Sequence, residues 1–143
     1  MLKSTKNEVM ELLSNVSFFS DCSRRELSQL ASRVEQRRVD SDAALVRQGE
    51  PGDEFFVVAE GLAEATIDGR RVGSIHPGSF FGEMALLDQG PRVATVTASV
   101  PTRVLVLDAR GFAAVVKDMP SVALKVMRGL AARLRAVEAG LGA

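Results

Sequence analysis

Residues 80–96 read FFGEMALLDQGPRVATV. Both ends of this 80–96 segment are apolar and typical of strands, whereas Glu83 to Leu87 has the composition of about one helical turn following the flexible Gly82. Gly90-Pro91 is a loop signal, and the chain returns to a strand after Arg92. A short helix enclosed between two strands is unusual, which makes the segment the candidate for a binding function.

The segment combines groups that suit a phosphate and a sugar. The first amides of a helix have no partner inside it and carry partial positive charge, and Gly82 and Ala85 leave the approach to them unobstructed. The Arg92 guanidinium can meet two oxygens of one phosphate, and its charge matches that of a phosphodiester. The Glu83 carboxylate repels a bare phosphate but accepts from a ribose hydroxyl. A nucleotide is therefore predicted rather than inorganic phosphate.

Short apolar or alternating runs surround the segment from residue 39 to 108. Turn signals separate them at residues 49–53, 68–69 and 76–78. The predicted strands are Ala44–Val46, Phe55–Ala59, Ala63–Ile67, Arg71–Ile75, Ala94–Ala98 and Arg103–Leu107. Evenly spaced short strands with tight turns favour a jelly-roll or barrel over a doubly wound α/β sheet.

Helical patterns occupy both ends of the chain. Residues 1–38 predict two short helices, the second opened by a capping box from Ser23 to Glu26. Residues 109–143 predict a short helix after the N-cap Asp108 and a long one from about Pro120. The expected fold class is mixed α+β, with an antiparallel β-roll or jelly-roll at 39–108 flanked by N-terminal helices and a long C-terminal helix. One domain, residues 1–143, is expected.

The last helix carries a narrow apolar seam whose members are spaced three and four residues apart. These residues are Met127, Leu130, Leu134, Val137 and Leu141. Such a seam is typical of one helix packing lengthwise on another. It predicts either a homodimer or packing of the helix back on the strand body, and both interpretations stand at this point.

Composition narrows the classes of partner. The 143 residues include 18 Lys plus Arg and 18 Asp plus Glu, so neither direct nucleic acid binding nor membrane binding is predicted. Cys22 lacks an internal disulfide partner, and with one histidine, His76, there is no zinc cluster. No apolar run approaches the ~18–20 residues that cross a bilayer. We expect a cytoplasmic protein with no cofactor, no metal and no catalytic residues.

At the 80–96 segment the chain resembles the cyclic-nucleotide-binding domain family of bacterial cAMP-receptor transcription factors, kinase regulatory subunits and nucleotide-gated channels. The resemblance rests on FGEMALL and PRVATV within the segment, preceded by a glycine framework with FFVV at 55–58. It implies cAMP, or less favourably cGMP, as the ligand. By the resemblance, Gly82 and Ala85 hold the phosphate, Glu83 accepts from the ribose 2′-hydroxyl, and Arg92 pairs with the cyclic phosphate.

The resemblance also suggests the residues near the base. Val93 stands where members that favour cGMP often carry a hydroxyl, which favours cAMP here. Ala63 is expected on the purine side of the pocket, and the C-terminal helix is expected to close over the base with Arg133 as a candidate contact. Val137 occupies the position at which bacterial receptors place a hydroxyl. The remaining candidate ligand-binding residues are Phe81, Met84 and Ala94.

The expected function is a non-enzymatic regulatory module in signal transduction, in which nucleotide binding moves the C-terminal helix. Two alternatives stay open. The chain could be a fragment of a cAMP-receptor-type transcription factor, which needs a helix-turn-helix after the long helix, whereas this chain stops at Ala143. It could also be a structural dimerisation module that no longer binds nucleotide.

Overall fold

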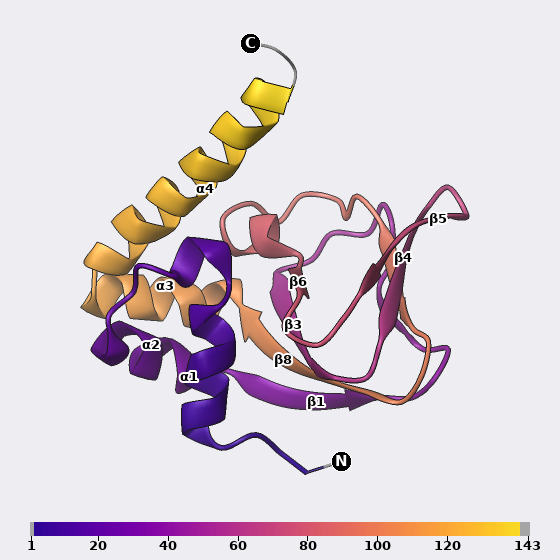
Figure 1. Cartoon of the computed structure of the whole chain (residues 1–143), viewed down its shortest axis with the longest axis horizontal. Helices are drawn as coiled ribbons and strands as arrows, with labels where there is room; N and C mark the ends of the chain where they lie inside the picture. Colours follow the sequence, from indigo (N-terminus) through magenta and orange to yellow (C-terminus); the bar gives the residue numbers. More distant parts are fainter. Residues whose placement is uncertain (1, 141–143) are drawn as a thin grey trace.

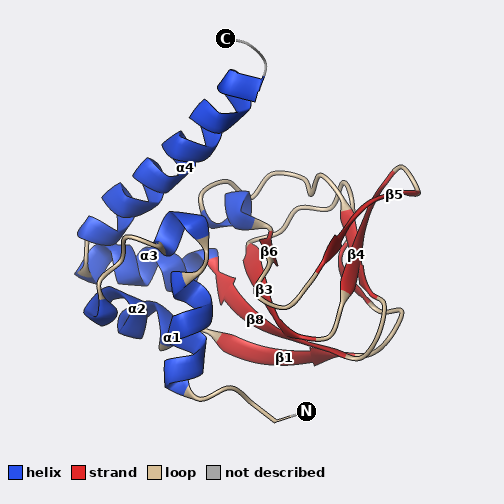
Figure 2. Cartoon of the chain, viewed as in Figure 1, coloured by secondary structure: helices blue, strands red, loops and turns tan. Residues whose placement is uncertain are grey.

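The structure is a computed structural model, and it describes residues 2–140. Two four-stranded antiparallel sheets form the body of the molecule, and the helices from the two ends of the chain are gathered on one side of it (Figures 1 and 2). The helical elements are α1 (Lys6–Ser14), η1 (Ser17–Phe19), α2 (Arg24–Ala31), η2 (Glu83–Leu86), α3 (Ala109–Asp118) and α4 (Ser121–Gly140). The strands are β1 (Glu35–Val39), β2 (Ala44–Val46), β3 (Glu54–Glu60), β4 (Ala63–Ile67), β5 (Arg70–Ile75), β6 (Phe80–Phe81), β7 (Thr95–Ala98) and β8 (Thr102–Asp108). The predicted fold class is confirmed.

The strands form two sheets of order β1-β8-β3-β6 and β2-β7-β4-β5. All six predicted strands are present, and the sheet begins at Glu35, four residues before the expected start of the roll at residue 39. The sequence of β1, EQRRV, has no apolar alternation. Its strand conformation comes from five antiparallel pairings with β8, and its charged side chains suit the edge of a sheet.

Side-chain caps fix where the helices begin. The predicted capping box of α2 is confirmed: Ser23 Oγ accepts from the Glu26 amide, and the Glu26 carboxylate accepts from the Ser23 amide. Thr5 and Glu8 form the same arrangement at α1. The Asp108 carboxylate accepts from the Gly111 amide at 2.7 Å and caps α3 as predicted.

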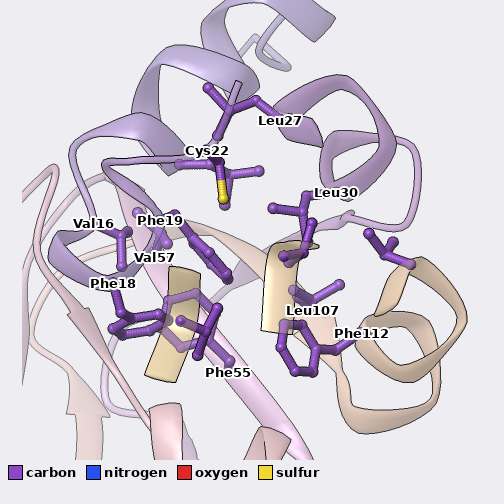
Figure 3. Close-up of a cluster of buried hydrophobic side chains, with 14 of the residues drawn as sticks. Val16, Phe18, Phe19, Cys22, Leu27, Leu30, Phe55, Val57, Leu107 and Phe112 are labelled. Carbon is purple, nitrogen blue, oxygen red and sulfur yellow. The ribbon is translucent and has the colours of Figure 1, made fainter. Parts of the chain in front are cut away.

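The sheet containing β3 is the middle of three layers, so the molecule has two hydrophobic cores. The first lies between this sheet and the helices and includes Phe18, Phe55 and Leu107 (Figure 3). The second lies between the two sheets and includes Phe56 and Ile75. Successive residues of a strand point to opposite faces, and β3 therefore contributes to both cores.

Helix α4 is packed along its first half and exposed along its second. Val122 and Val126 are buried, and Gly129 lies so close to η1 that a Cβ there would overlap the Phe18 backbone. Residues 131–140 are exposed, and the helix projects away from the body (Figure 1).

The predicted seam follows this division. Leu130 packs against the first core, whereas Met127, Leu134 and Val137 are 57%, 61% and 59% exposed. Most of the seam thus does not pack back on the strand body. Leu141 lies outside the described residues.

Candidate functional site

A pocket of about 350 Å³ opens between η2, the loop after it and the second sheet. One wall comes from residues 81–94 of the 80–96 segment. The opposite wall is apolar and comes from four strands, with the residues Val46, Ala65, Ile75 and Val96. The pocket therefore has one side with charged and backbone groups and one side suited to a flat apolar group.

The Arg92 guanidinium is held on the polar side of the pocket. Its Nη2 donates to the Glu54 carbonyl oxygen at 2.9 Å, and its Cζ lies 6.0 Å from the centroid of the Phe56 ring. Burial lowers the pKa of Arg92, although the carboxylates of Glu54 and Asp53 favour the charged form. The group keeps its proton at neutral pH because arginine does not deprotonate in proteins.

The backbone around Arg92 is fixed from a second loop. The Gly49 amide donates to the Arg92 carbonyl, and the Arg92 amide donates to the Glu50 carbonyl, both at 2.9 Å. An isolated bridge joins Pro51 to Pro91. Two loops far apart in the sequence thus hold the guanidinium beside the pocket.

Gly82 shapes the start of η2. Its φ of +79° lies in the left-handed region, and a Cβ there would stand 2.8 Å from Arg92 Nη1 and 2.9 Å from the Glu54 carbonyl oxygen. Both the backbone angle and the space therefore require glycine. The amide of Ala85, expected to bind phosphate, donates to the Gly82 carbonyl at 3.1 Å. The amides of Glu83 and Met84 come earlier in the turn, where helical amides have no acceptor within the helix.

Glu83 connects the pocket to α4. Its Oε1 accepts from Arg133 Nη1 at 2.8 Å, and the Glu83 side chain is 20% exposed. The Arg133 Cζ also lies 5.6 Å from the centroid of the Phe80 ring. Arg133, a candidate contact for a base, thus contacts the predicted sugar acceptor in this structure.

The candidate residues within the 80–96 segment all line the pocket. They are Phe81, Gly82, Glu83, Met84, Ala85, Arg92, Val93 and Ala94. Ala63 does not: it is fully buried in the second core. Ala65, two residues further along β4 and on the same face of the strand, lines the pocket instead.

The apolar wall and three further lining residues, Asp88, Gly90 and Pro91, were not predicted as site residues. Asp88 Oδ1 accepts from the Gly90 amide at 2.9 Å, which shapes the loop before Arg92. The position of this loop inside the 80–96 segment was the available signal for these three. In the apolar wall, Val96 also lies inside that segment, whereas Val46, Ala65 and Ile75 had only strand alternation to indicate them.

Two further properties concern metals and membranes. In residues 2–140, His, Cys, Asp and Glu side chains form no group of three that could hold a metal ion. No helix in that same range is long and apolar enough to span a bilayer.

Comparison with known proteins gives consistent matches. Residues 36–119 match a sequence family described as "Cyclic nucleotide-binding domain". The cGMP-dependent protein kinase egl-4 of Caenorhabditis elegans is 35% identical over 123 residues, which are 81% of this chain and 16% of the kinase. The cAMP-dependent protein kinase regulatory subunit of Dictyostelium discoideum is 36% identical over 110 residues, which are 71% of this chain and 34% of the subunit.

This chain therefore spans only a minor part of the length of these two relatives. Among solved structures, the N-terminal domain of a transcriptional regulator from Streptomyces coelicolor A3(2) superposes with a TM-score of 0.82 at 27% identity. The superposition covers 91% of this chain and 94% of that domain. The similarity thus extends over nearly all of both chains.

Proposed function

Because the chain belongs to the cyclic-nucleotide-binding domain family, we propose that it binds cAMP in preference to cGMP in the pocket beside Arg92. The observation that carries the proposal is the arrangement of Arg92, Gly82 and Glu83 around one pocket of about 350 Å³. This volume falls within the range of ~300–1,000 Å³ typical of small-molecule sites. The chain is a cyclic-nucleotide-binding regulatory domain, and the proposal concerns its ligand and its mode of action.

The proposed pose assigns each part of the nucleotide to one part of the pocket. The cyclic phosphate pairs with Arg92, whose planar fork of donors suits two phosphate oxygens, and the early amides of η2 lie at the same side. The ribose 2′-hydroxyl donates to Glu83. The purine lies against the apolar wall of Val46, Ala65, Ile75 and Val96.

The preference for cAMP rests on the absence of polar side-chain atoms at the part of the pocket proposed to hold the purine. Val93, 62% exposed, has no hydroxyl to meet the guanine amino group, and the side chains of the apolar wall carry no polar atoms. A guanine amino group buried there without a partner would cost binding free energy. The two kinase relatives are named for different nucleotides, one for cGMP and one for cAMP. Competing titrations of the two nucleotides test this preference.

The proposed role needs binding alone and no chemical step. The lining of the pocket includes an arginine and two carboxylates, and among the described residues that line it there is no serine, cysteine, histidine or lysine. We propose that bound nucleotide favours a state in which α4 lies closer over the base. A ligand shifts such an equilibrium by its difference in affinity for the two states.

We further propose that the exposed seam of α4 forms a homodimer and that the protein acts in the cytoplasm without contacting nucleic acid itself. The exposure of Met127, Leu134 and Val137 supports the dimer. The superposition on the Streptomyces coelicolor domain favours a second candidate, in which this chain is the sensor part of a transcriptional regulator.

The test of the nucleotide site is Arg92→Ala. We expect cAMP binding to weaken by about 2–5 kcal/mol, the range for truncating one partner of a buried charged pair, measured by titration calorimetry. Arg38→Ala, on the exposed face of edge strand β1, is the matched control and should bind like the parent. Unchanged affinity in Arg92→Ala, with the fold intact by circular dichroism, would refute the proposed function.

A further inference from the structure

Arg37 and Glu54 project from the face of the sheet β1-β8-β3-β6 that meets the other sheet. Arg37 is paired across the strands with Val104, and Glu54 precedes Phe56 by two residues on β3. Val104 and Phe56 both belong to the second core. Residues that are paired across strands, or that stand two apart along one strand, share a face. Both charged side chains therefore lie on the same face as the Phe56 ring, and the Arg92 Cζ lies 6.0 Å from the centroid of that ring.

The ion pair between Arg37 and Glu54 is bidentate. Arg37 Nη1 donates to Glu54 Oε1 at 3.2 Å, and Nη2 donates to Oε2 at 2.8 Å. The bonds to Glu54, and further bonds to Glu35, raise the pKa of Arg37, so its guanidinium stays charged. Within residues 2–140, the Glu54 carboxylate is ion-paired with Arg37 and not with Arg92. The Arg37 fork thus occupies both oxygens of this carboxylate.

Glu54 also lies close to Arg92. Its carbonyl oxygen accepts from Arg92 Nη2 at 2.9 Å. Burial lowers the pKa of Arg92, and the negative charge of Glu54 acts against this by favouring the charged form. A second hollow of about 210 Å³ is lined by both residues, and the Glu54 side chain is 31% exposed. The carboxylate therefore has space to turn toward the Arg92 guanidinium once Arg37 no longer holds it.

A guanidinium that is paired with a carboxylate is a weaker partner for a phosphate. Carboxylates and phosphates accept from the same two donors of the arginine fork, so an internal carboxylate and a bound phosphate exclude each other. When the binding-competent state is only partly populated, the apparent affinity falls by the same fraction. Holding the Glu54 carboxylate elsewhere avoids this loss, because the Arg92 fork is then available before the ligand arrives.

We propose that Arg37 is a positioning residue that keeps the Glu54 carboxylate away from Arg92 and so leaves the Arg92 guanidinium available to the cyclic phosphate. This inference rests on the proposed function. Arg37 does not line the pocket and acts through Glu54 alone. Its contribution to binding should therefore disappear when Glu54 is replaced by an uncharged residue of the same shape.

The experiment is a square of four proteins, with dissociation constants for cAMP measured by titration calorimetry. The proteins are the parent, Arg37→Gln, Glu54→Gln and the double variant. We expect Arg37→Gln to weaken cAMP binding about threefold to fivefold, the upper end for a partly exposed ion pair. Glu54→Gln should bind at least as tightly as the parent. The double variant should bind within about twofold of Glu54→Gln, because no carboxylate remains to be held away.

The control is Arg38→Gln, which removes the same charge from the next residue of β1. Arg38 is exposed and points to the opposite face of the strand, so this variant should bind cAMP like the parent. An equal loss in Arg38→Gln would mean that net charge alone sets the affinity, and the inference would be wrong. Unchanged binding in Arg37→Gln would also overturn it.

Rescue by the second substitution separates positioning from a merely structural role. If the double variant binds no better than Arg37→Gln, then Arg37 does not act through the charge of Glu54, and the inference fails. Thermal unfolding shows whether each variant is folded. Should Arg37→Gln not fold, Arg37→Lys takes its place, since lysine keeps the charge but lacks the fork. Its smaller loss of affinity should likewise be removed by Glu54→Gln.

Failure of the proposed function has a different signature. It would appear as parent protein that does not bind cAMP, or as Arg92→Ala with unchanged affinity. The inference about Arg37 would fall with it in either case. If Arg92→Ala loses affinity as expected and the double variant shows no rescue, only the inference fails.

Discussion

Arg92 stands beside the pocket because the neighbouring residues leave space for its side chain. A Cβ at Gly52 would overlap Nε and Nη2 of the guanidinium, although Gly52 does not itself line the main pocket. The backbone angle of Gly52 is ordinary, so its role is one of space alone. The overlap caused by an added methyl group at Gly52 can be relieved if the end of the Arg92 side chain moves away.

Gly52→Ala should therefore weaken cAMP binding while leaving the fold stable. The displaced guanidinium loses its alignment with the phosphate, and a hydrogen bond to a charged group is worth about 1.5–3 kcal/mol. Calorimetry gives the affinity, and thermal unfolding gives the stability. Gly73→Ala, where a Cβ would meet open space, is the control. If Gly52→Ala binds cAMP like the control, then cAMP binding does not depend on the present position of the Arg92 guanidinium.

Sequence reasoning found those pocket residues that are close together along the chain. The eight candidates between Phe81 and Ala94 share one continuous motif, so no tertiary information was needed. The choice between Ala63 and Ala65 did need it. Both lie on the same face of β4, and the structure buries Ala63 opposite Ile75 and Ala98. Depth along a strand cannot be derived from alternation, which gives only the face.

At the scale of elements, Glu26 links two helices besides capping one. Its carboxylate accepts from the Ser23 amide on α2 and from Ser121 and Lys125 at the start of α4. Burial alone would raise the pKa of Glu26, but the hydrogen bonds from Lys125, Ser121 and Ser23 lower it from 4.5 to about 2. The folded state therefore binds this proton less readily than the unfolded chain does.

This pKa predicts how stability depends on pH. Because the pKa is lower in the folded state, the contribution of Glu26 is complete above about pH 4.5 and is lost as the pH falls from 4.5 to about 2. Glu26→Gln should lower the free energy of unfolding at pH 7 by about 1–3 kcal/mol, and its deficit should shrink across that range. Urea denaturation at several pH values measures both.

Glu8→Gln is the matched control for the cap. Glu8 holds the equivalent capping position at α1 but is exposed, so its replacement should cost less stability at pH 7. If the loss of unfolding free energy in Glu26→Gln stays constant down to pH 2, the lowered pKa of Glu26 in the folded state would be contradicted.

Elements that owe their structure to a distant partner were the ones that sequence reasoning missed. The strands β2 and β4 have the predicted bounds because apolar residues and turns mark them. The charged β1 has no such mark, and its pairing with β8 connects residues more than 60 positions apart. The capping box of Ser23 was predictable, whereas the links from Glu26 to Ser121 and Lys125 depend on how α2 and α4 pack.

At the scale of the whole molecule, the exposed seam predicts association between copies of the chain. Leu134→Glu should weaken homodimerisation by at least about tenfold, because burial of a leucine side chain contributes ~1.5–3 kcal/mol. Sedimentation velocity over a range of concentrations measures the effect. Ala136→Glu adds the same charge to the exposed half of α4, away from the seam, and should leave association unchanged. A parent protein that remains monomeric at high concentration would refute the dimer.

The fold class was predictable because evenly spaced strands and turns leave few architectures open. The layering was not, because it depends on which face of the middle sheet meets the helices. That choice divides neighbouring phenylalanines between the cores: Phe55 lies in the first and Phe56 in the second.

The two residues of β6 are divided in the same way. The Phe80 ring packs edge-on to Phe18 at 5.4 Å, in the helical layer, whereas the Phe81 ring stacks on Phe56 at 4.8 Å, between the sheets. A strand of two residues cannot slide or rotate without moving both rings. Any displacement that a ligand imposes on Gly82 is thus resisted from two sides by close-packed aromatic rings. A shift at Gly82 would therefore have to be accommodated in both hydrophobic cores at once.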